Sequence, residues 1–140
     1  MIQEKPEELI AFSVPLTAPS VNHLYKPIKY KGKDGFLHSG RKLSGEAKAF
    51  KDAVTIFARG RTVAPADPKE RKLARYRVKI HTVLGPGARM DCDNAAKLCC
   101  DALQWCGVID SDAKVIDCGL TIDRADRENE RTEFIVERIP

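Results

Sequence analysis

One segment, DCDNAAKLCCDALQW at residues 91–105, predicts the central helix of this protein. We expect this helix from about Asp93 to Trp105, because apolar residues recur in it at helical spacing. The expected buried face consists of Ala96, Cys99, Cys100 and Leu103. Asp93, Lys97 and Asp101 lie four residues apart and form a charged stripe beside that face. Gly107 is expected to end the helix.

The rest of the sequence predicts a first strand at residues 9–14, then one more helix and three more strands. Ser44 is expected to cap a helix that stops at Gly60, and strands are expected at residues 76–84, 114–122 and 132–138. In the first of these strands, apolar residues such as Tyr76, Val78 and Ile80 alternate with basic ones, which predicts one apolar face and one basic face. The polar segment 17–43 is expected to be a long functional loop, and 61–74 a surface connection with one helical turn. The prediction is a single α+β domain over residues 1–140, a mixed β-sheet with two main helices in the order β-α-β-α-β-β.

Composition places the chain among ordinary globular proteins. It has 140 residues, of which 43% are hydrophobic and 31% charged. No apolar run approaches the roughly 20 residues that cross a bilayer, so we expect no membrane partner. The acidic start, residues 1–8, does not resemble a signal peptide, and the expected location is cytoplasmic. The five cysteines form no C-x-x-C pair, which favours reduced core residues over a zinc site.

Three carboxylates carry the strongest chemical signal. Asp91 and Asp93 open the helix, and Asp112 follows its end. Carboxylates set close together repel one another unless a cation lies among them. Mg²⁺ prefers such oxygen ligands, and Lys97 would lie one helical turn beyond Asp93. The other interpretation is that these acids cap the helix and complete a turn, and both interpretations stay open at this point.

A second signal is the basic segment that follows residue 22. The net charge of the chain is only +4, but residues 22–51 hold eight lysines and arginines against two acids. Tyr25, Tyr30, Phe36 and His38 are interleaved with the basic residues. This pattern is typical of a phosphate-backbone surface and equally of a solvated loop.

Four stretches, taken together and in order, carry a family resemblance. They are VPLTAPSVNHLY at residues 14–25, LSGEAKAFK at 43–51, DCDNAAK at 91–97 with DAL at 101–103, and GVIDSDAKV at 107–115. In these stretches, which span most of the chain, the sequence resembles the RusA family of Holliday-junction resolvases. The combination of D-x-D-N-x-x-K, D-A-L and G-V-I-x-x-D is more specific than any one piece.

The resemblance implies a RusA-like fold and a Mg²⁺-dependent endodeoxyribonuclease that resolves four-way DNA junctions in recombination and repair. Two symmetric phosphodiester cuts need two active sites, so it also implies a homodimer. Asp91, Asp93 and Asp112 match the family's catalytic, metal-holding carboxylates, and Lys97 matches its catalytic lysine. Asp110 has no counterpart in the family pattern.

The expected DNA contacts lie in the basic segment and before the first aspartate. They are Asn22, Tyr25, Lys26, Lys29, Lys31, Lys33, Arg41, Lys42 and Arg89. The family carries an arginine-rich run before the first aspartate, whereas residues 85–90 hold only Arg89. The segment after Asn22 is therefore expected to make more of the DNA contacts than residues 85–90.

Two other functions fit parts of the same pattern. One is a non-catalytic nucleic-acid-binding protein, in which the acids cap a helix and the lysines bind phosphate. The other is a metal-dependent nuclease for flapped, other branched or RNA substrates. Trp105 is expected in the core rather than at a dimer interface.

Overall fold

The computed structural model describes residues 7–19, 25–125 and 129–140, with only the backbone described at 25, 26 and 40–43. It is a small α+β domain with a mixed sheet and three helices among these residues. The elements are β1 (Leu9–Val14), β2 (Tyr25–Lys31), β3 (Leu37–Leu43), α1 (Gly45–Ala58), α2 (Pro68–Leu73), β4 (Arg75–Leu84), α3 (Cys92–Trp105), the 3₁₀ turn η2 (Asp112–Lys114), β5 (Val115–Arg124) and β6 (Arg131–Ile139).

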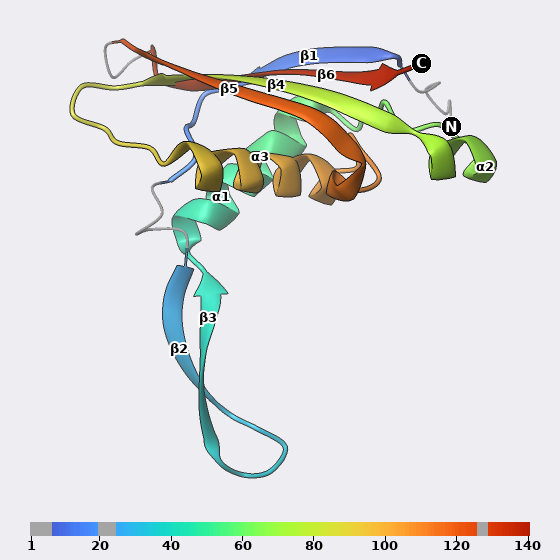
Figure 1. Ribbon diagram of the computed structural model, residues 1–140. Helices are drawn as coiled ribbons and strands as arrows, with labels where there is room; N and C mark the ends of the chain where they lie inside the picture. Colours follow the sequence, from blue (N-terminus) through green and yellow to red (C-terminus); the bar gives the residue numbers. More distant parts are fainter. Residues whose placement is uncertain (1–6, 20–24, 126–128) are drawn as a thin grey trace.

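The main sheet has four strands in the order β1-β6-β4-β5. β4 and β5 run parallel and are joined through α3, whereas the other neighbours are antiparallel. Helices α1 and α3 cover one face of this sheet (Figure 1). Along β4, Tyr76, Val78 and Ile80 are buried toward the helices, while Arg77 and Lys79 alternate with them. The apolar and basic faces predicted for this strand are therefore confirmed.

Helix α1 begins and ends as the sequence predicts. The Ser44 hydroxyl accepts a hydrogen bond from the Ala47 amide at 3.2 Å, which satisfies a free donor of the first turn. Phe50 and Val54 lie on the buried face of this helix. The chain then leaves the helix through Arg59 and Gly60, both with positive φ. The short connection that follows contains one helix, α2, capped by Asp67.

Helix α3 forms where it was expected, but its buried face is rotated. The buried residues are Ala95, Leu98, Cys99, Ala102 and Leu103. Ala96 and Cys100, predicted to be buried, are only half-buried. The helix packs against both α1 and β5, so the positions of these two neighbours determine which of its residues are buried. Small residues such as alanine and cysteine fit either face, and their spacing alone did not determine the rotation.

Trp105 is not a core residue, so that prediction is wrong. It is the last residue of α3 and 69% of it is exposed. The Lys51 ammonium lies 4.7 Å from the centre of its ring. The indole is thus covered on one side by a cation–π contact from α1 rather than by apolar side chains.

The segment predicted as a long loop contains a β-hairpin instead. β2 and β3 pair antiparallel from Tyr25 opposite Leu43 to Lys31 opposite Leu37. A turn at residues 32–36 joins them, in which Gly35 has a φ of 82° and the Asp34 carboxylate accepts from the Phe36 amide at 3.0 Å. The hairpin projects away from the helices and the main sheet (Figure 1). We call residues 25–43 the basic arm.

Membrane insertion has no support among the described helices. None of those in residues 7–19, 25–125 and 129–140 combines the length and apolar character needed to cross a bilayer.

Candidate functional site

The two aspartates at the start of α3 both have a local structural role. Asp91 is the N-cap of the helix, and its carboxylate accepts from the Asn94 amide at 3.2 Å. Asp93 lies in the first turn, where a negative charge interacts favourably with the helix dipole. Both side chains are exposed. Capping and the dipole therefore account for their positions without a metal ion.

Asp112 lies near the opposite end of α3. It begins the turn η2, and its amide donates to the Gln104 side chain at 2.8 Å. Its carboxyl interacts with that of Asp101, which comes from the third turn of α3, and raises the pKa of the Asp101 group. We call Asp101 and Asp112 the acidic pair. Asp101 is half-buried and Asp112 is exposed, so the pair opens to solvent.

Two lysines accompany the acidic pair. Burial, the hydrogen bond with Asp112 and the charge of Asp112 raise the pKa of the Asp101 carboxyl, and the charges of Lys51 and Lys97 oppose this rise. Lys97 lies one helical turn before Asp101, and Lys51 comes from α1. The site thus joins side chains from both helices and from the turn after α3.

The structure does not bring the three predicted carboxylates together. Asp93 precedes Asp101 by eight residues, which is roughly 12 Å along the helix axis at 1.5 Å per residue. Among the described residues, no group of three or more histidine, cysteine, aspartate or glutamate side chains is placed to hold a metal ion. The partner of Asp112 is instead Asp101. The sequence contained one signal for it, the stripe of Asp93, Lys97 and Asp101, but not the contact across to η2.

The donor chemistry of the acidic pair fits Mg²⁺. Two carboxylates that lie in contact must share a proton or a cation, because two adjacent negative charges are unfavourable. Here partial burial and the neighbouring Asp112 carboxyl raise the pKa of the Asp101 carboxyl. Mg²⁺ is commonly held by one or two carboxylates, with water and substrate phosphate as its other ligands. A dication bound by both groups would neutralise their charge.

Asp110, two residues before Asp112, has a structural role. It accepts hydrogen bonds from the Tyr76 hydroxyl and the Lys114 ammonium, each at 2.5 Å. Burial acts to raise the pKa of Asp110, but the hydrogen bonds from Lys114 and Tyr76 outweigh it and keep this pKa below its usual value. The same ammonium donates to the Arg71 carbonyl at 2.6 Å. Asp110 thus ties β4, η2 and the end of α2 together.

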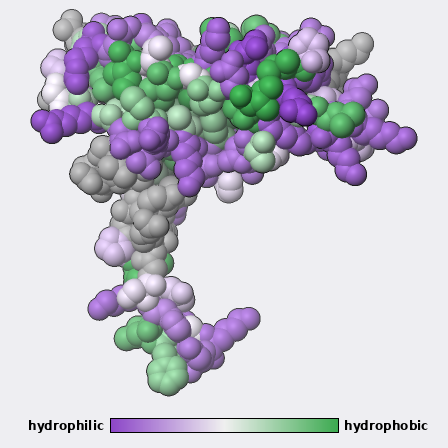
Figure 2. Space-filling view, viewed as in Figure 1, coloured by the Kyte–Doolittle hydropathy of each residue, from purple (hydrophilic) through white to green (hydrophobic). Residues whose placement is uncertain are grey.

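The basic arm presents cations and an apolar tip to solvent. Lys29, Lys31 and Lys33 are exposed. At the tip, Phe36 is 72% exposed and Leu37 is 76% exposed, and Figure 2 shows apolar surface at the free end of the arm. Of the other predicted DNA contacts, Asn22 lies outside the described residues, as do the side chains of Tyr25, Lys26, Arg41 and Lys42.

Arg89, the last predicted DNA contact, is exposed in the connection that leads into α3. The guanidinium of Arg124 donates to the neighbouring Ala88 carbonyl at 2.9 Å. A second arginine therefore reaches this connection from the end of β5. Sequence spacing could not reveal it, because Arg124 follows Arg89 by 35 positions.

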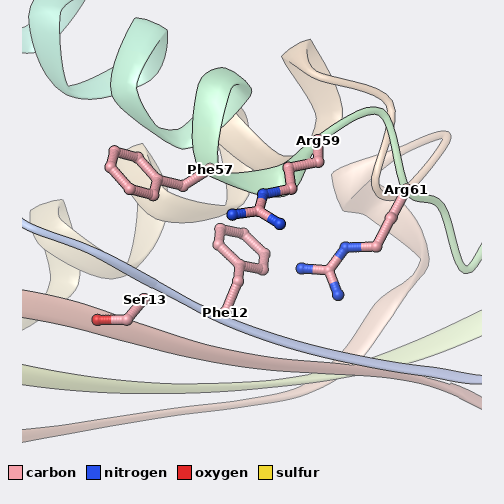
Figure 3. A pocket seen from close by; sticks show the side chains of 5 residues that line it. All are labelled: Phe12, Ser13, Phe57, Arg59 and Arg61. Carbon is pink, nitrogen blue, oxygen red and sulfur yellow. The ribbon is translucent and has the colours of Figure 1, made fainter.

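A separate pocket of about 420 Å³ lies between β1 and the end of α1 (Figure 3). It is lined by Phe12, Ser13, Phe57, Arg59 and Arg61. Arg61 donates to the carbonyls of Ala58 and Ala11, at 3.1 and 3.4 Å. Its guanidinium therefore satisfies backbone acceptors at the end of α1 and in β1, and we assign this pocket no catalytic role.

No protein-family model and no curated protein sequence matches this chain. The features of this chain that bear on its function are the acidic pair, its two lysines and the basic arm.

Proposed function

We propose that this protein is a Mg²⁺-dependent, structure-selective endodeoxyribonuclease of the RusA type that resolves four-way DNA junctions. The observation that carries the proposal is the acidic pair, Asp101 and Asp112, with Lys51 and Lys97 beside it. Carboxylates and a lysine are the groups that hydrolysis of a phosphodiester needs. The four stretches of RusA-like sequence support the same activity and a RusA-like fold.

The side chains have distinct roles in this proposal. Asp101 and Asp112 would hold the ion, whereas Asp91 and Asp93, the ligands that the sequence predicts beside Asp112, lie at the other end of α3. A bound Mg²⁺ supplies a more acidic water and neutralises charge on the scissile phosphate. Lys97 is exposed on the same stripe as Asp101, where its ammonium can bind a phosphate oxygen. Lys51 keeps a second positive charge near the pair and is oriented by the Trp105 ring.

The basic arm provides the proposed grip on DNA. Lys29 and Lys31 are two residues apart on β2, so they point to the same side of the ribbon. Each phosphate that a lysine neutralises releases counterions and makes binding depend on salt. Replacing Lys29, Lys31 and Lys33 by alanine should reduce the slope of log affinity against log salt by up to about 3. An unchanged slope would remove the arm from the DNA interface.

Two further features of the proposal follow from the reaction. Paired cuts across a junction need two active sites, so the active form is a homodimer. Sedimentation of the protein alone and with junction DNA tests this stoichiometry. The proposed location is cytoplasmic.

The deciding experiment measures cleavage of a mobile synthetic four-way junction and a linear duplex of the same sequence. Cleavage of the junction should require Mg²⁺ and be blocked by chelation. Asp112→Asn and Asp101→Asn should each lower the rate by at least about 100-fold, since loss of outer-shell groups alone costs 10- to 100-fold. Glu70→Gln, an exposed acid on α2, is the matched control and should cleave normally. Asp112→Asn with normal cleavage would disprove the mechanism.

The same series separates the acidic pair from the predicted ligands at the start of α3. If Asp91→Asn and Asp93→Asn cleave normally while Asp101→Asn does not, the pair alone forms the metal site. If all four variants lose activity, the carboxylates at the start of α3 also take part in the reaction, as the sequence predicts. Junction binding measured in Ca²⁺ shows whether each loss lies in binding or in cleavage.

A non-catalytic nucleic-acid-binding protein is the second candidate. It is favoured by Asp91, whose capping hydrogen bond already explains one of the acids, and by the lack of a three-ligand group among the described residues. This candidate predicts salt-dependent DNA binding through the arm but no Mg²⁺-dependent product on any panel of junction, flapped, RNA or linear substrates. The same panel identifies a nuclease whose preferred substrate is not a four-way junction.

A further inference from the structure

Two cysteines from different elements meet beside the acidic pair. Cys100 on α3 and Cys118 on β5 have their sulfur atoms 3.9 Å apart and within hydrogen-bonding contact. The residue before Cys118, Asp117, is bound to Arg77, which alternates along β4 with the buried Tyr76 and Val78. Side chains alternate along a strand, so Cys118 points toward α3. The contact between the two sulfur atoms therefore results from the packing of α3 against β5.

We propose that Cys100 and Cys118 form a redox-modification site, at which a hydroperoxide converts the two thiols into a reversible disulfide bond. The sulfur atoms have to approach from 3.9 Å to about 2.05 Å, a movement of about 1.9 Å. Cys118 lies on an edge strand and is exposed, so the oxidant reaches it from solvent. Cys100 is half-buried beneath it, where a second oxidant molecule has less access.

The chemistry balances with one hydroperoxide. The Cys118 thiolate attacks the peroxide, so that an S–O bond forms, the O–O bond breaks and hydroxide leaves as water. Cys100 then attacks this sulfenic sulfur; the S–S bond forms, the S–O bond breaks and a second water leaves. Each sulfur loses one electron and the peroxide gains two. The hydrogen bond from Cys100 lowers the pKa of the Cys118 thiol, which supports its role as the first nucleophile.

The other cysteines provide internal controls. Cys92 is exposed at the start of α3 and Cys99 is buried. Burial raises the pKa of the Cys99 thiol, which makes it unreactive. Oxidation without a specific partner should therefore affect Cys92 as readily as Cys118, whereas the proposed site should react as a pair.

The test counts thiols in the full chain after treatment with hydrogen peroxide and denaturation. The reduced protein has five thiols. The oxidised protein should have three, since two of the five join, and should be lighter by two hydrogen atoms. Peptide mapping should find Cys100 linked to Cys118, and dithiothreitol should restore five thiols. Cys92→Ser should still lose two thiols, whereas Cys118→Ser should lose none.

Other outcomes would overturn the proposal. These are an unchanged thiol count, the loss of one thiol with oxygen added to Cys118, a bond to Cys92, or a bond between two chains. An effect of the disulfide on DNA cleavage depends on the proposed function, because Asp101 directly follows Cys100. The thiol count does not depend on it, so the failure of one inference is distinguishable from the failure of the other.

Discussion

Replacing Asp110 by alanine should destabilise the protein, whereas the same change at Asp112 should not. Asp110 accepts from the Tyr76 hydroxyl and the Lys114 ammonium, and its side chain is only 20% exposed. A hydrogen bond to a charged group contributes about 1.5–3 kcal/mol. Water replaces part of these two bonds in the variant, so the expected loss in the free energy of unfolding is smaller than their sum, about 2–4 kcal/mol.

Urea unfolding followed by circular dichroism measures this loss. For a domain of this size we take a slope of about 2 kcal/mol per molar urea, so the midpoint should fall by about 1–2 M. Tyr76→Phe removes only one of the two bonds and should cost about 1–2 kcal/mol. Combining both changes should cost less than the sum of the single losses, because Tyr76 and Asp110 share one interaction.

Asp112→Ala is the matched control in this experiment. Asp112 is exposed and lies against another carboxyl, so its removal should change the free energy of unfolding by less than about 0.5 kcal/mol. The reasoning is refuted if Asp110→Ala unfolds at the wild-type midpoint, or if Asp112→Ala loses as much stability as Asp110→Ala.

Three further predictions use single side chains. Phe36→Ala, at the exposed tip of the arm, should weaken junction binding by about 1–3 kcal/mol, the contribution of one base-stacking contact. A gel-shift assay should show unchanged affinity for a linear duplex. Equal losses on both substrates would mean that the tip does not recognise unstacked bases. Asp91→Ala should lower the free energy of unfolding by about 1 kcal/mol, whereas Asp91→Ser retains a capping oxygen and should not lower it. Equal melting temperatures of these two variants would refute the capping role. Cys118 should be alkylated by iodoacetamide at lower pH in the wild type than in Cys100→Ala, because the hydrogen bond from Cys100 lowers the pKa of Cys118 to about 7 and its thiolate forms as the pH rises through that value. Peptide mass spectrometry measures the alkylation, with the exposed Cys92 as the internal reference, and an equal pH dependence in the two proteins would refute the reasoning.

Local sequence signals predicted most of the layered part of the fold. The alternation of Tyr76, Val78 and Ile80 identified β4, and Ser44 with Gly60 delimited α1. These signals depend on neighbours within a few residues, which the sequence displays directly. The basic arm was missed because its glycines, lysines and proline resemble a loop, while its strands are held by pairing with each other.

The candidate site was harder to predict because its contacts cross elements. Asp91 and Asp93 stood out as neighbours in sequence, but the structure places Asp112 beside Asp101. That contact depends on where the chain returns after Gly107, which no local pattern specifies. The contact between Cys100 and Cys118 has the same origin, since it arises only when β5 packs along α3.

The arm's independence from the main sheet has a consequence for how the protein can diversify. Its described backbone pairing is between its own two strands, so insertions, deletions or exchanges at the hairpin leave the hydrophobic core intact. Chimeric chains with a foreign ribbon grafted between the positions that flank β2 and β3 should still fold. In the proposed nuclease, mutations in the arm could then change substrate preference without changing the acidic pair.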